Sequence, residues 1–142
     1  MTTTSADAVL NDVLISLHRS LLQYVVDAWP WTDAHSESHR AAMMTSAADQ
    51  NEIVDRLAEL LQERAYPVTF SQYPDFSNLN YVSLDFLLKR IVQNQKEVVA
   101  DCEEAARELA ENPEDGALAR KIAAAETERL KGLQELAAGS KP

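Results

Sequence analysis

The side chains of this chain that could do chemistry lie near the middle of four apolar, periodic segments. They are His18, Gln50, Gln95 with its neighbour Asn94 as an alternative, and Glu126. An imidazole and a carboxylate can bind one iron or zinc ion, and amide oxygens add only weak ligands. A buried polar group left unpaired costs about 1 to 3 kcal/mol, so the same residues would also suit a hydrogen-bonded polar layer. We favour the layer, with Glu126 and His18 as a charge-assisted pair.

A second group of candidate metal ligands lies further along the chain, at His35, His39, Asp49 and Glu52. His35 and His39 are four residues apart, so both imidazoles could share one helix face. No inward carboxylate accompanies them, and we expect a solvated first helical turn. At about 100° per residue, Asp49 and Glu52 lie about 80° and 140° from the inward direction set by Leu57. We therefore expect Glu52 to face solvent.

Four amphipathic helices must position these residues. Apolar side chains recur at helical spacing over residues 6–28, 33–64, 83–110 and 115–138. Ser5 and Ser83 are suited to cap the first and third helices, Pro67 ends the second, and Pro113 and Gly116 mark the turn before the fourth. Ala, Leu, Glu and Gln are abundant, and β-branched and aromatic residues are sparse. The chain is therefore predicted to be one all-α domain over residues 1–142.

Residues 65–82 break the helical pattern between the second and third helices. An extended segment of this length can span about 60 Å at about 3.3 Å per residue. Helices of about 25 to 30 residues are only about 37 to 45 Å long. The segment can therefore return along the whole molecule and set the third helix parallel to the second. We predict two helical hairpins joined by a long crossover whose apolar residues, Val68, Phe70 and Tyr73 among them, pack against the helices.

This connectivity resembles that of ferritin-like four-helix bundles of the bacterioferritin and rubrerythrin kind, and more distantly that of the mini-ferritins. The run DRLAELLQERAYP, residues 55–67, is similar to the end of their second helix. The resemblance implies a di-iron site with a Glu from each of two helices and a Glu-x-x-His from each of the others. Here Gln50 and Ile53 stand where the second helix would supply Glu and His, and Glu126 is followed by Arg129 instead of His. We therefore expect a degenerate di-iron motif.

Composition excludes several classes of function. The formal charge is -10 and the 13 Lys and Arg are scattered, which disfavours binding to nucleic acid and to anionic membranes. Cys102 is the single cysteine, so no internal disulfide can form, and its place on an apolar stripe predicts a buried small hydrophobe. No secretion signal or membrane span is found, so we expect a cytoplasmic protein. No Gly-rich phosphate loop, G-x-S-x-G or C-x-x-C motif suggests an enzyme.

Two functions remain open. The first is a ferritin-like bundle without a di-iron centre, acting as a binding or structural module for an unknown ligand. It would self-associate as a dimer or larger homo-oligomer through apolar surface at Met43, Met44 and Tyr24. The alternative is a ferritin-like metalloprotein that binds iron or zinc at the bundle waist or a subunit interface and oxidises or stores it. In that case Asp55 and Glu59 would resemble the interface carboxylates of mini-ferritins, although we expect both to be solvated.

Overall fold

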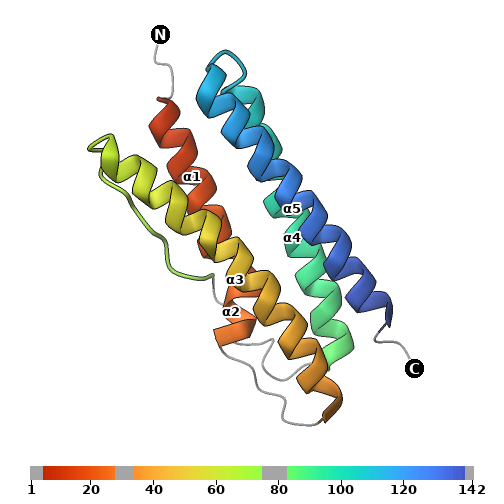
Figure 1. The fold of residues 1–142 in the computed structure, drawn as a ribbon. Helices are drawn as coiled ribbons and strands as arrows, with labels where there is room; N and C mark the ends of the chain where they lie inside the picture. The colour runs from red at the N-terminus through yellow and green to blue at the C-terminus, as the bar shows by residue number, and fades with distance from the viewer. Residues whose placement is uncertain (1–4, 28–33, 75–82, 140–142) are drawn as a thin grey trace.

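The chain is helical throughout most of the part described by the computed structural model, which comprises residues 5–27, 34–74 and 83–139. The helices are α1 (Ala6–His18), α2 (Leu21–Asp27), α3 (Ala34–Glu63), α4 (Leu84–Glu108) and α5 (Pro113–Gly139). These described ranges contain no strand, which confirms the predicted all-α class. Figure 1 shows α1 and α2 following one another along one rod, with α3, α4 and α5 as three further rods.

The four rods run in two directions. α3 and α4 run one way, and α1 and α5 run the other way (Figure 1). α4 packs closely along α5, and α1 packs against α3 and α4, whereas α3 and α5 touch at few places. None of the described helices is both long and apolar enough to cross a lipid bilayer.

The segment that follows α3 lies along the first rod. Asn11 of α1 donates through Nδ2 to Thr69 Oγ1 at 2.7 Å, and Oδ1 of Asn11 accepts from the Thr69 N–H at 3.0 Å. Further along, the ring of Tyr73 meets that of Tyr24 edge-on, with centroids 5.4 Å apart. The described part of the predicted crossover therefore packs against the helices as it passes. Residues 75–82 of that prediction lie outside the described residues.

The predicted helix starts are confirmed at Ser5 and Ser83 and corrected for α5. Both serine side chains accept a backbone N–H in the first turn of their helix, at 3.1 and 3.2 Å. α5 begins at Pro113, a residue type favoured at the first helical position. Gly116 therefore lies inside the first turn of α5 and does not mark a turn between helices. A Cβ at Gly116 would lie 2.5 Å from the Leu109 carbonyl oxygen, so close packing explains the glycine.

The prediction of one continuous helix over residues 6–28 is wrong, because the helix breaks between α1 and α2. Ser20 caps α2, and its Oγ accepts the N–H of Gln23 at 3.4 Å. The N–H of Leu21 donates to Asn94 Oδ1 of α4 at 3.0 Å, and not to a carbonyl of its own helix. A side chain that captures a backbone group in this way interrupts the helical ladder.

α3 ends in a left-handed residue that is not glycine. Ala65 has φ 57°, the N–H of Tyr66 donates to the Leu61 carbonyl at 2.9 Å, and the N–H of Ala65 donates to that of Gln62 at 3.0 Å. These two bonds form a Schellman motif, in which glycine is the preferred left-handed residue. A residue with a Cβ carries a penalty of roughly 1 to 2 kcal/mol in this conformation.

Ala65→Gly is expected to raise the free energy of unfolding by about 1 kcal/mol, because glycine removes the Cβ penalty. Urea unfolding followed by circular dichroism measures the change. The matched control is Ala100→Gly at an exposed site within α4, which should lower stability by about 1 kcal/mol. Equal destabilisation by both variants would show that the left-handed conformation carries no strain.

Candidate functional site

A layer of buried polar side chains divides the apolar core into two halves. One half contains Leu14, Leu57, Val98 and Ile122. The other half contains Leu21, Met43, Leu88 and Leu133. Between these halves lies the waist layer, which we define as Ser20, Gln23, Gln50, Gln95, Glu126 and Arg129. Every rod contributes to this layer near its middle.

Glu126 lies at the centre of the waist layer and has no exposed surface. Its Oε1 accepts from Gln50 Nε2 at 2.8 Å, from Gln95 Nε2 at 3.0 Å and from Arg129 Nε at 3.1 Å. Its Oε2 accepts from Arg129 Nη2 at 2.9 Å. The Arg129 side chain is itself only 7% exposed, so the buried negative charge is neutralised by a positive charge that is also largely buried.

The hydrogen-bond network fixes which way both amides point. Oε1 of Gln50 accepts from Ser20 Oγ and from Gln23 Nε2, each at 3.0 Å. The NH₂ group of Gln50 is therefore the end that faces Glu126. Nε2 of Gln95 also donates to the main-chain oxygen of Glu126 at 3.0 Å, which sets the same orientation on the other side. N–H groups, and not oxygen lone pairs, surround the carboxylate.

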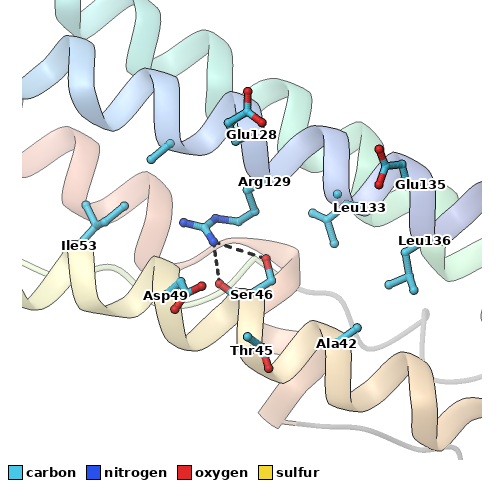
Figure 2. A pocket seen from close by; sticks show the side chains of 12 residues that line it. Ala42, Thr45, Ser46, Asp49, Ile53, Glu128, Arg129, Leu133, Glu135 and Leu136 are labelled. Atoms are coloured by element: carbon cyan, nitrogen blue, oxygen red, sulfur yellow. Dashed lines mark hydrogen bonds between the residues drawn. The ribbon is translucent and has the colours of Figure 1, made fainter.

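Two further bonds attach the waist layer to the backbone of α3. Nη1 of Arg129 crosses from α5 and donates to the Ser46 carbonyl oxygen at 2.9 Å (Figure 2). Nε2 of Gln23 donates to the Ala47 carbonyl oxygen at 2.7 Å. Both carbonyls belong to consecutive residues of one helical turn. The waist layer therefore fixes how α3 sits against α2 and α5.

The waist layer does not suit a di-iron centre of the kind that the sequence resemblance implies. Such a centre needs several carboxylate oxygens and imidazole lone pairs directed into one cavity. Here one carboxylate is present, a guanidinium occupies it, and both neighbouring amides offer N–H groups. Over residues 5–27, 34–74 and 83–139, no group of three or more His, Cys, Asp or Glu could hold a metal ion.

The structure brings together three of the four predicted waist residues and leaves the fourth apart. Gln50, Gln95 and Glu126 are joined by hydrogen bonds, and the choice of Gln95 over Asn94 is resolved because Asn94 binds the backbone of α2. The predicted pair between His18 and Glu126 is wrong. The Glu126 carboxylate already accepts hydrogen bonds from Gln50, Gln95 and Arg129. Arg129, one turn further along α5, takes the place predicted for an imidazole.

His18 instead contacts the segment that follows α3. Its ring lies edge-on to Phe70 with centroids 4.9 Å apart, and it is parallel to the ring of Tyr73 at 6.5 Å. Within the part of the chain that the structure describes, Nδ1 of His18 is buried and has no hydrogen-bond partner. His18 therefore helps to hold this segment against the first rod.

Of the second group of predicted ligands, the structure describes three side chains, and these form no metal site. His39 is buried, which corrects the expectation of a solvated first turn, and the side chain of His35 lies outside the described residues. Asp49 is exposed. Glu52 faces solvent as predicted, and its Oε1 forms an ion pair with Nη2 of Arg56 at 2.9 Å.

Sequence reasoning missed Ser20, Gln23 and Arg129. Ser20 and Gln23 have the S-x-x-Q spacing of a capping box, which would have signalled a new helix start inside the predicted first helix. Glu126 and Arg129 are three residues apart, a spacing at which opposite charges meet on a helix. Arg129 was read only as the absence of a histidine.

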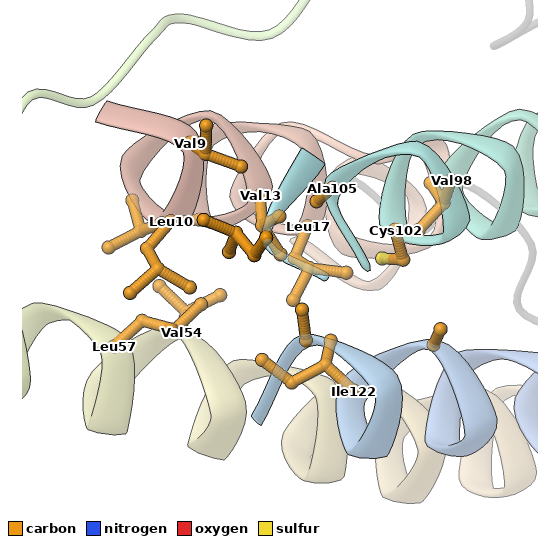
Figure 3. Close-up of a cluster of buried hydrophobic side chains, with 14 of the residues drawn as sticks. Val9, Leu10, Val13, Leu17, Val54, Leu57, Val98, Cys102, Ala105 and Ile122 are labelled. Carbon is orange, nitrogen blue, oxygen red and sulfur yellow. The ribbon is translucent and has the colours of Figure 1, made fainter. Parts of the chain in front are cut away.

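Cys102 lies in the apolar half of the core that contains Leu17 and Val98 (Figure 3). Burial, together with the nearby carboxylates of Glu126 and Asp101, raises the pKa of the Cys102 thiol to about 12. The thiol is therefore protonated at neutral pH. This confirms the prediction of a small buried hydrophobe.

Comparisons of this chain with family models, with curated proteins and with solved structures find no match. The geometry of the waist layer therefore carries the functional argument.

Arg129→Leu is expected to lower the free energy of unfolding by about 3 to 5 kcal/mol, because it leaves the Glu126 carboxylate buried without its counter-charge. Adding Glu126→Gln should recover part of the loss, since a neutral amide oxygen can still accept from Gln50 and Gln95. Urea unfolding measures both variants.

Arg107→Leu is the control for this experiment, since Arg107 also pairs with a glutamate three residues away but lies in solvent on α4. It should change stability by less than about 1 kcal/mol. Our account fails if the double variant is as unstable as Arg129→Leu alone.

Cys102 is expected to resist thiol reagents in the folded protein at pH 8, because a pKa raised to about 12 leaves almost no thiolate at that pH. Reaction with a disulfide reagent, followed by absorbance, should be slow in buffer and rapid in urea. Rapid stoichiometric reaction of the folded chain would contradict the buried placement.

Proposed function

We propose that this chain is a four-helix bundle of ferritin-like connectivity that holds no di-iron centre and acts as a structural or binding module. The waist layer holds the helices in place, and the surface of the bundle makes the contacts with other molecules. The chain performs no reaction at the waist layer.

The placement of the described elements supports the ferritin-like connectivity. α3 and α4 run in the same direction, so the chain between them must return along the molecule. In support of this return, Thr69 bonds to Asn11 of α1, and Tyr73, further along the chain, contacts Tyr24 of α2. These contacts follow the path that a long crossover requires.

One observation carries the functional part of the proposal: the only carboxylate of the waist layer is already saturated. Gln50, Gln95 and Arg129 together direct N–H groups at both oxygens of Glu126. A metal ion would have to displace the Arg129 guanidinium and turn both amides over. Turning Gln50 over would in turn break its bonds to Ser20 and Gln23.

The alternative, a ferritin-like protein that oxidises or stores iron or zinc, finds less support. Asp55 and Glu59, which would contribute to an interface site, are exposed on α3 as expected, and no described imidazole stands beside them. An interface site would depend on histidines supplied by a second chain.

Metal analysis of protein purified without a polyhistidine tag tests the proposal. We expect less than stoichiometric iron and zinc after incubation with either ion, and a melting temperature that a chelator leaves unchanged. The same metal analysis of Arg129→Leu, which removes the guanidinium from the Glu126 carboxylate, is the comparison for the unmodified chain. About two irons per unmodified chain, as di-iron bundles bind, lost on Glu126→Ala, would establish the alternative instead.

A further inference from the structure

A groove runs between α3 and α5 on the outside of the bundle. Its wide part has a volume of about 840 Å³ and its narrow part about 340 Å³. Ile53 and Ala125 line both parts, so the two hollows adjoin at these residues. Along α3 the groove extends from Ala42 to Leu60, about 27 Å at about 1.5 Å per residue. Figure 2 shows the wide part, with α3 and α5 facing one another across it.

The groove is apolar at its floor. The aliphatic residues that line it are Ile53, Leu57, Leu60, Leu118, Ile122, Leu133 and Leu136. Ile53, Leu60, Leu118 and Leu136 are only partly buried. In the wide part, a Cβ added at Gly132 would meet no atom within 4 Å, so that wall of the groove is open. Partly exposed aliphatic side chains gathered along one groove favour a docking site there.

Charged residues divide the groove into an acidic and a basic half. Asp49, Glu128 and Glu135 line the wide part, and Arg56 and Lys121 line the narrow part. Arg129 also lines the wide part, but Glu126 already neutralises it. An occupant of the groove must therefore be basic at one end and acidic at the other.

The spacing of these charges is the same on both helices and has the same midpoint. Asp49 and Arg56 are seven residues apart on α3, and Lys121 and Glu128 are seven residues apart on α5. Seven residues make two helical turns, so each pair projects from one face. The midpoints fall beside Ile53 and Ala125, where the two hollows meet.

We propose that the occupant of this groove is a second copy of the same chain. A two-fold axis that crosses the groove between Ile53 and Ala125 sets each helix antiparallel to its counterpart. Asp49 then faces Arg56 of the partner subunit, and Glu128 faces Lys121 of the partner subunit. Symmetry repeats each contact, which gives four ion pairs around an apolar centre. A foreign partner would not require the same spacing and midpoint on both helices.

The same axis places the narrow half of one copy over the wide half of the other. With the midpoint on α5 near residue 125, Leu118 of one copy comes to the level of Gly132 of the partner subunit, where the wall of the groove is open.

Local ion pairs do not prevent these contacts. Arg56 already pairs with Glu52, and Glu128 pairs with Lys131 at 3.1 Å. All four side chains are more than half exposed, and such surface pairs contribute at most about 1 kcal/mol each. Of the methionines that the sequence suggested as association surface, Met43 is fully buried in the core and Met44 is exposed. Neither lines the groove.

This inference rests on the proposed function, because it names the partner of the surface module. Sedimentation velocity of the full chain tests it. The unmodified chain should dimerise, and Arg56→Glu should raise the dimer dissociation constant about tenfold or more, because it sets like charges opposite each other. Asp49→Arg combined with Arg56→Glu restores opposite charges across the axis and should restore the dimer.

Lys89→Glu, an exposed reversal on α4 away from the groove, is the matched control and should leave the dimer unchanged. The inference is overturned if the chain is a monomer at every concentration, if Arg56→Glu has no more effect than the control, or if the exchanged pair fails to restore association. If the chain is a monomer that binds no metal, this inference alone fails. If the chain binds stoichiometric metal, the proposed function fails, and the variant with Asp49→Arg and Arg56→Glu still decides whether the dimer forms as described.

Discussion

The packing of the four rods depends on one buried carboxylate, which requires a counter-charge and hydrogen-bond donors. Glu126 has no access to water, and an unpaired charge there would cost several kcal/mol. Arg129 supplies the counter-charge from the same helix, and Gln50 and Gln95 supply N–H groups from α3 and α4. Because these donors come from three rods, the carboxylate can be satisfied only when the rods are in one register. The polar centre therefore specifies the packing of the aliphatic residues on either side of it.

The break in the first rod belongs to the same arrangement. The Ser20 hydroxyl donates a hydrogen bond to Gln50 Oε1. Nε2 of Gln23 donates to the same oxygen and to the Ala47 carbonyl oxygen of α3. A continuous helix through this point would occupy the N–H of Leu21, which instead binds Asn94. The interruption brings two polar side chains and one backbone group to the level of the carboxylate. Irregular backbone at the waist thus brings the Ser20 and Gln23 side chains within hydrogen-bond distance of Gln50.

The amphipathic periodicity was sufficient to predict four rods and the inward phase of Gln50 and Glu126, because burial of apolar faces dominates these features. The caps at Ser5 and Ser83 were predicted from the residue type alone, since a serine hydroxyl can accept a first-turn N–H. The break at Ser20 and the partner of Glu126 were not predicted. Their signals in the sequence are polar and short-range, namely the S-x-x-Q spacing of Ser20 and Gln23 and the charge pair of Glu126 and Arg129, and hydrophobic spacing does not record them. Gly116 was misread as a turn because its role is the close approach of α5 to the Leu109 carbonyl, a contact visible only in three dimensions.

The hydrogen exchange of the Gln50 and Gln95 side-chain amides in solution tests most directly whether the Glu126 carboxylate is closed to water and to cations. Nuclear magnetic resonance of these NH₂ groups reports whether they are held by the carboxylate and whether a cation can reach it. We predict slow hydrogen exchange for both groups, and resonances that do not change when zinc is added. Rapid exchange, or zinc-dependent shifts confined to these two amides, would show that the carboxylate is open and that the waist is a ligand site.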